Sequence, residues 1–139
     1  MTISDKTYKK IISLIKPAPP ETGGILGGIS NTVTYFVFDV GLKTKNAGCY
    51  YPNIQRLNYI LSLWHCNNID FFGMVHSHLN NQTTLSSSDI QYIKKIMYSM
   101  PHKNKSLYFP LVINNKLFSY KATLINKRIY IENDIIKFC

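Results

Sequence analysis

The sequence has few acidic residues. Seven Asp and Glu stand against sixteen Lys and Arg, which gives a formal net charge of +9 at pH 7. This imbalance indicates nucleic acid or an acidic protein surface as a partner. The lysines are nevertheless spread along the chain, with short clusters at Lys9–Lys10, Lys94–Lys95 and Lys103/Lys105 and no nucleic-acid recognition motif beside them. We therefore do not expect nucleic-acid binding to be the main role of the protein.

Cysteine is also scarce, and long apolar runs are missing. Cys49, Cys66 and Cys139 are odd in number and too scattered for a disulfide framework or a zinc knuckle, which fits a reducing cytosol. No run of about 20 apolar residues is present, so we expect no membrane-spanning helix. The first residues lack the basic-then-apolar layout of a signal peptide. We predict a cytoplasmic protein without membrane partners.

The remaining composition is that of a globular protein. A chain of 139 residues with 45% hydrophobic content is large enough for one domain with a real core. Apolar periodicity predicts mixed α/β structure around one sheet. Helices are expected at 5–16, at 57–67 and after 86, and a loop at 41–56. Strands are expected at 21–28, 31–40, 71–78, 107–113, 117–124 and, as a third closing strand, 128–131. A hairpin turn is expected at Asn114–Asn115.

Two histidines follow the most apolar strand. Because side chains alternate along a strand, His76 and His78 project to one face while Ser77 points to the other. Asp89 lies in the first turn of the next expected helix and can turn back toward them. Two histidines and one carboxylate, with a fourth position left to water, are typical of a catalytic zinc site rather than a structural one. The alternative for the histidines is a solvent-facing strand end.

Asp89 also has a purely structural interpretation. Ser86-x-x-Asp89 is a helix capping box, in which each of the two side chains accepts a hydrogen bond from the backbone N–H of the other residue across the first helical turn. The spacing from His76-x-His78 favours the metal ligand, while Ser86 can still cap the helix.

Other candidate groups are weaker. His65-Cys66 resembles a nucleophile pair, but adjacent residues on a helix do not face each other, so we expect packing roles for both. His102 lies in a basic turn and is expected to be solvated. Trp64 at helical spacing is expected in the core.

Glu21, His76-x-His78 and Ser86-x-x-Asp89 together resemble the signature of the JAMM zinc metalloproteases, also called JAB or MPN-plus proteins. Residues 21–28 look especially like the prokaryotic members. The resemblance covers nearly the whole chain in element order and implies a single-domain JAB/MPN fold over residues 1–139, a cytidine-deaminase-like mixed β-sheet flanked by helices. One departure is Leu79, which stands where family members commonly have proline.

The resemblance also implies a reaction. The enzyme would be a zinc-dependent isopeptidase or peptidase that cleaves after the C-terminal glycine of a ubiquitin-like modifier, with one Zn²⁺ per chain held by His76, His78, Asp89 and water. Glu21 would act as general base and then acid, and Ser86 would donate a hydrogen bond to the oxyanion. The implied partners are the modifier, its conjugates and the matching activating and conjugating enzymes. Compact bacterial members of the family occur in operons for ubiquitin-like conjugation, including those of antiviral cyclic-oligonucleotide (CBASS) systems.

Two other classes of function stay open. A non-catalytic MPN-type scaffold has the same fold but has lost ligand residues, whereas every motif residue is kept here. A basic nucleic-acid-associated domain of related fold would show a steep salt dependence of its affinity for DNA or RNA.

Overall fold

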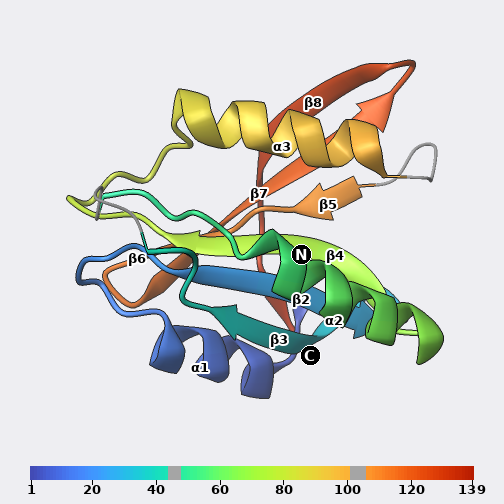
Figure 1. Cartoon of the computed structure of the whole chain (residues 1–139), viewed down its shortest axis with the longest axis horizontal. Helices are drawn as coiled ribbons and strands as arrows, with labels where there is room; N and C mark the ends of the chain where they lie inside the picture. The colour runs from blue at the N-terminus through green and yellow to red at the C-terminus, as the bar shows by residue number, and fades with distance from the viewer. Residues whose placement is uncertain (44–47, 101–105) are drawn as a thin grey trace.

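The computed structural model describes residues 1–43, 48–100 and 106–139, and within them three helices flank a nine-stranded mixed sheet (Figure 1). The helices are α1 (Asp5–Leu14), α2 (Ile54–Cys66) and α3 (Ser87–Ser99). The strands are β1 (Thr2–Ile3), β2 (Gly23–Ile29), β3 (Thr32–Asp39), β4 (Asp70–Ser77), β5 (Ser106–Tyr108), β6 (Leu111–Ile113), β7 (Lys116–Ile125), β8 (Arg128–Asp134) and β9 (Lys137–Phe138).

Strand β4 lies near the middle of the sheet. The strand order is β5-β7-β6-β4-β2-β3-β1-β9, and β8 pairs with β7 outside this path. Strand β4 runs antiparallel to β2 and parallel to β5 and β6. Its carboxyl end is therefore enclosed by strands on both sides, which makes it a rigid support for side chains that project from it.

The expected α/β organisation is confirmed, with several changes of boundary. The strand expected at 107–113 is two strands, because Phe109 and Pro110 interrupt it and proline has no N–H for a ladder. Strand β2 begins at Gly23, so Glu21 precedes it rather than opening it. Helix α2 begins at Ile54, inside the segment expected to be a loop, because the Asn53 side chain accepts a hydrogen bond from the Arg56 N–H and caps it. Strands β1 and β9 were not expected.

The sheet has a hydrophobic core on each face. Helix α1 covers one face and α3 the other (Figure 1), and α2 packs on the same face as α3. Neighbouring residues of β4 serve opposite cores: Val75 packs with Ile11 on the α1 face, and Met74 packs with Ile93 on the α3 face. The alternation continues past Met74, so β4 directs every second side chain toward α3.

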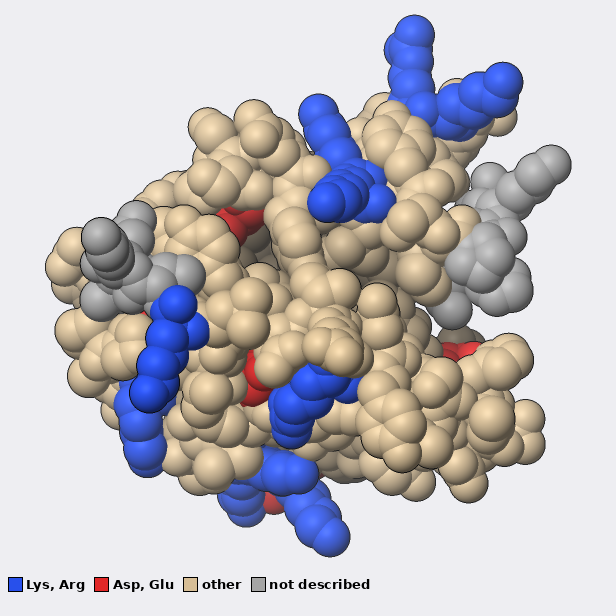
Figure 2. Space-filling view, in the orientation of Figure 1, with Lys and Arg blue, Asp and Glu red and all other residues tan. Residues whose placement is uncertain are grey.

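The surface agrees with the charge pattern of the sequence. On the face shown in Figure 2, Lys and Arg side chains occur from the upper to the lower edge, with mostly uncharged surface and a few acidic side chains between them. The Lys103/Lys105 cluster and His102 lie outside the described residues. Cys66 and Cys139 are exposed and form no disulfide within the described residues. None of the helices described combines the length and the apolar character needed to traverse a bilayer.

Candidate metal centre

The end of β4 holds two histidines against the sheet. The backbone N–H of His76 donates to Pro110 O at 3.3 Å, and that of His78 donates to Val112 O at 3.1 Å. Their rings lie edge to face with centroids 4.8 Å apart. Ser77, between them, is fully buried. The two imidazoles therefore lie on the same side of β4, as predicted.

A tight turn then orients the second imidazole. Asn80 and Asn81 both have a φ of 58°, and the N–H of Gln82 donates to Leu79 O at 3.3 Å. Asparagine tolerates this left-handed backbone, which makes it suited to such a turn. The turn brings the Gln82 carbonyl to 3.1 Å from His78 Nδ1. Because a carbonyl only accepts, Nδ1 carries the proton and the lone pair of Nε2 is left for a metal ion.

Asp89 combines the two roles that the sequence left as alternatives. Its Oδ2 accepts a hydrogen bond from the Ser86 N–H at 2.8 Å, and its own N–H donates to Ser86 Oγ at 3.1 Å, so the capping box is complete. The same carboxylate lies 2.9 Å from His78 Nε2 and 3.1 Å from His76 Nε2. Capping fixes the carboxylate, and the fixed carboxylate faces both imidazoles.

The three side chains fit a metal ion. Their ligand atoms lie within 4.8 Å of one another. Although His76 Nε2 is close to the carboxylate, the geometry is not that of a hydrogen bond, and among the described residues this buried nitrogen has no partner. The Nε2 lone pair of His78 faces Asp89 Oδ2, and both are hydrogen-bond acceptors. A proton or a cation is therefore required between them. One divalent ion satisfies all three groups.

The electrostatics of the cluster favour the charged forms of both Asp89 and His78. Burial opposes ionisation of Asp89, but the two imidazoles outweigh it and hold the pKa of this carboxyl well below its usual range. Burial likewise opposes a charged His78, but the neighbouring Asp89 carboxylate outweighs it and raises the pKa of His78. A carboxylate that stays ionised is the form that binds a metal ion.

Glu21 lies in the same cleft, just before β2. The next residue is anchored by the buried serine of β4: the Thr22 N–H donates to Ser77 Oγ at 3.0 Å, and the Ser77 N–H donates to Thr22 O at 2.8 Å. Burial raises the pKa of Glu21, and the charges of His76 and His78 oppose this only in part. A carboxyl group with a raised pKa is a better proton acceptor.

Leu79 contributes to the same carboxyl group through its backbone. Its backbone N–H acts on the Glu21 carboxyl group and lowers the pKa of Glu21 in part. Proline, which commonly occupies this position in the JAMM pattern, has no N–H and could not exert this effect. The departure from the pattern therefore adds a contact to Glu21 and leaves the ligands in place.

Tyr50 is a cleft residue that sequence reasoning missed. Its ring stacks near His76, with centroids 6.4 Å apart and planes 18° apart. Its hydroxyl donates to Asp39 Oδ2 at 2.6 Å, and the buried Asp39 also accepts from the Asn53 N–H at 3.0 Å. Burial and Asp39 together raise the pKa of Tyr50, so its hydroxyl stays protonated. The ring approaches β2 closely because Gly23 has no side chain: a Cβ there would lie 2.6 Å from a ring carbon of Tyr50.

The cleft itself is larger than the metal site. It has a volume of about 460 Å³ and is lined by apolar and aromatic side chains as well as by polar groups. The cleft is lined by Glu21, Gly48, Cys49, Tyr50, Tyr51, Pro52, Met74, Val75, His76, His78, Gln82, Ser86, Ser88, Asp89, Tyr92, Ile93 and Phe109. All five site residues expected from the sequence therefore lie in one cleft.

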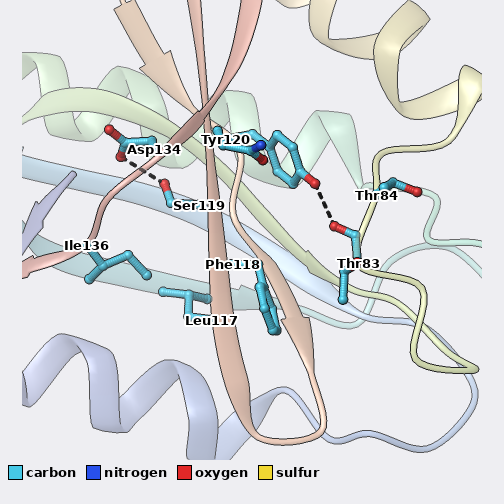
Figure 3. A pocket seen from close by; sticks show the side chains of 9 residues that line it. Thr83, Thr84, Leu117, Phe118, Ser119, Tyr120, Asp134 and Ile136 are labelled. Atoms are coloured by element: carbon cyan, nitrogen blue, oxygen red, sulfur yellow. Dashed lines mark hydrogen bonds between the residues drawn. The ribbon is translucent and has the colours of Figure 1, made fainter.

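A second hollow carries less chemistry. It lies over β7 and β8 and has a volume of about 530 Å³ (Figure 3). Its acidic residue, Asp134, is already occupied by the Met1 amino group and by the Ser119 hydroxyl at 3.1 Å. The Tyr120 hydroxyl donates to Thr83 O at 2.6 Å. The side-chain oxygens of Asp134, Ser119 and Tyr120 are thus used within the protein.

The other sequence candidates lie apart from the cleft. Trp64 is buried against Gly27, where a Cβ would lie 2.6 Å from its ring, so its expected core role is confirmed. His65 and Cys66 are exposed at the end of α2, and neither lines the cleft.

Comparison with known proteins adds information on the fold. No protein-family model matches the chain, and no curated protein matches it. Among solved structures, by contrast, 122 chains are similar to it. Protein DSY2949 from Desulfitobacterium hafniense has 15% identity and a TM-score of 0.66 over 99% of this chain and 92% of its own. A protein from Salinibacter ruber has 14% identity and a TM-score of 0.58 over 98% and 90%.

The third structure carries a family description. AF2198 from Archaeoglobus fulgidus, a JAB1/MPN domain protein, has 20% identity and a TM-score of 0.58 over 99% of this chain and 98% of its own. Likeness at these identities concerns the fold. The chain therefore has the JAB/MPN fold, as its sequence motifs implied.

Proposed function

We propose that this chain is a zinc-dependent isopeptidase or peptidase that cleaves after the C-terminal glycine of a ubiquitin-like modifier. The observation that carries the proposal is the convergence of His76, His78 and Asp89 on one point, with Glu21 in the same cleft. Two histidines and a carboxylate with an open position are the ligand set of catalytic zinc. The choice of zinc, and of the modifier as substrate, rests on the JAMM resemblance.

The chain's own groups supply the remaining parts of a hydrolysis. When bound, zinc supplies Lewis acidity, which polarises a carbonyl group and makes water more acidic. Glu21 accepts a proton from the attacking water and delivers it to the departing amine nitrogen. Ser86 Oγ accepts a hydrogen bond from the Asp89 N–H, so its own hydroxyl proton is left to be donated to the developing oxyanion. Water adds across the peptide bond, and no further reactant is needed.

The cleft also suits an extended tail. Tyr50, Phe109 and Met74 form apolar wall beside the candidate metal ligands. Ligand clefts of this kind bind mainly through apolar surface, with a few polar groups setting orientation. A modifier ending in glycine would place little bulk beside the ring of Tyr50, where larger residues would meet it.

The first test separates chemistry from metal binding. Glu21→Gln should keep about one zinc per chain and lower hydrolysis of a modifier–fluorophore amide by at least about 10²-fold, because a general base contributes that much or more. The measurements are metal content by mass spectrometry and fluorescence release from a panel of ubiquitin-like modifiers with C-terminal glycine. Asp70→Asn removes an exposed acid of β4 and serves as the matched control.

The same experiment distinguishes the alternatives. Retained turnover in Glu21→Gln would remove Glu21 from the mechanism. A protein that binds no zinc and cleaves none of the panel would be a scaffold of the same fold, and a steeply salt-dependent affinity for DNA or RNA would identify a nucleic-acid-associated domain. The proposed pathway is a bacterial, cytoplasmic conjugation system of antiviral type. Its test is whether genes for an activating enzyme, a conjugating enzyme and a modifier lie beside this one.

A further inference from the structure

Strand β8 leaves one edge of the sheet open. It pairs with β7 from Arg128 to Asp134, and along the described parts of the chain no strand pairs with its other edge (Figure 1). An edge strand presents unpaired N–H and C=O groups that can pair with another chain. At seven residues, β8 is long enough to do so in a defined register.

The turn before β8 determines which backbone groups face outward. Asn126 and Lys127 have φ values of 48° and 63°, the left-handed pair of a type I′ hairpin. In that hairpin Ile125 and Arg128 form a hydrogen-bonded pair, and the pairing then alternates along the strand. Arg128 and every second residue after it thus bond to β7.

The residues between them, Ile129, Ile131 and Asn133, direct their N–H and C=O groups to the open edge. A hydrogen bond on the far side of β7 agrees with this assignment. The Phe109 N–H donates to Tyr120 O at 2.8 Å, so Tyr120 bonds away from β8, and the residue opposite it is Asn133. The open edge therefore offers three outward-facing donor and acceptor pairs.

We propose that β8 pairs antiparallel with β8 of a second copy of this chain, about a twofold axis at Tyr130. In this register Ile129 lies opposite the partner's Ile131 and exchanges backbone hydrogen bonds with it. Arg128 lies opposite the partner's Glu132, and each such pair occurs twice by symmetry. The sequence of the strand is thus complementary to itself in charge and in apolar character.

The side chains that would meet are accessible. Arg128, Tyr130 and Glu132 are exposed, Tyr130 by 53%. They occupy non-hydrogen-bonded positions of the new ladder, where opposing side chains lie closest and opposite charges stabilise. On β7, Lys121 lies opposite Glu132. Across the joined sheets the charges would alternate from Lys121 to Glu132 to the partner's Arg128.

The next register is less favourable. Shifting by two residues would set Arg128 against the partner's Asp134. That carboxylate is already bound by the Met1 amino group and the Ser119 hydroxyl. The register centred on Tyr130 instead pairs two charges that make no ion pair within 4 Å among the described residues.

The pairing leaves the metal cleft open. The cleft lies at the N-terminal end of α3, whereas the hairpin tip lies at its C-terminal end, where the Tyr98 hydroxyl donates to Lys127 O at 3.2 Å (Figure 1). The dimer is therefore independent of the proposed function, and each copy would keep an accessible site.

A charge-swap cycle tests the register. In sedimentation equilibrium over about 1 µM to 1 mM protein, we expect a concentration-dependent dimer, because one strand pair buries less than a standard interface. Arg128→Glu or Glu132→Arg alone should raise the dissociation constant by about tenfold or more, since each sets like charges opposite each other. The double variant Arg128→Glu/Glu132→Arg should return to within about threefold of the parent. Lys16→Glu, an exposed site on the α1 side, is the control for net charge.

Amide hydrogen exchange tests the backbone. Raising the protein concentration should slow exchange at Ile129 and Ile131, while Tyr130, already bonded to β7, should not change. A monomer throughout the range would overturn the proposal and would leave Arg128 and Glu132 as charges that protect an edge from pairing. A dimer that ignores both single reversals, or a double variant that stays dissociated, would overturn it as well.

Discussion

Single residues at this site carry more than one task. The Asp89 carboxylate accepts the Ser86 N–H and also faces both imidazoles. Ser77 is buried behind the histidines and holds Thr22, which sets the position of Glu21. The Asp89 carboxylate thus caps α3 and faces the imidazoles at the same time, and Ser77 aligns the segment that carries Glu21. The site gains rigidity without additional residues.

Ser86 provides a test at this scale. Ser86→Ala should lower turnover by about 10²–10³, the loss found when one oxyanion donor is removed, while zinc content stays near one per chain. It should also cost about 1 kcal/mol in unfolding free energy as a lost helix cap. Ser4→Ala is the matched control, because Ser4 caps α1 by accepting from the Thr7 N–H at 3.2 Å, far from the cleft. Equal losses of turnover in both variants would show that Ser86 acts only as a cap.

At the scale of elements, β4 depends on one unusual backbone position. Gly73 has a φ of +136°, beside an irregularity in the β2–β4 register between Leu26 and Gly27. A Cβ at Gly73 would lie 1.8 Å from Tyr108 O on the neighbouring strand. The close approach of β5 to β4 thus requires glycine.

Gly73→Ala should therefore lower the unfolding free energy by more than about 2 kcal/mol, through both backbone strain and collision with Tyr108. Urea unfolding followed by circular dichroism measures the change. Asp70→Ala, at an exposed position of the same strand, should stay within about 0.5 kcal/mol of the parent. A midpoint for Gly73→Ala equal to that of the control would contradict the assigned role of this glycine.

For the whole molecule, the candidate metal centre links the middle of the sheet to the start of α3. A ligand that binds only the folded state stabilises it by about 2.7 kcal/mol when present at 100 times its dissociation constant. Removal of the metal with a chelator should therefore lower Tm by roughly 5–10 °C, and added zinc should restore it. Differential scanning calorimetry provides the measurement.

His76→Ala serves as the comparison, since it should bind little zinc and its Tm should not respond to the chelator. An equal response in parent and variant would place the stabilising metal somewhere other than this centre. Because the His76 ring also lies near Tyr50, the comparison is made between treated and untreated protein of the same variant.

Much of the site could be predicted from the sequence because its signals are local. Alternation along a strand places His76 and His78 on one face, and Ser86 and Asp89 lie three positions apart at the start of a helix. The turn at Asn80 and Asn81 follows a similar local rule, since asparagine adopts left-handed backbone. Such patterns depend on neighbours in sequence, so they can be read before the fold is known.

Other features depend on contacts between distant parts of the chain, and only the tertiary structure decided them. Tyr50 reaches His76 because Asp39 holds its hydroxyl and Gly23 leaves room for its ring. The two-residue strands β1 and β9 exist because the chain ends pair side by side, and two residues show no periodicity. The sequence by itself determined which residues could form a site, whereas the packing of the sheet decided which surfaces lie around it and which edge stays open.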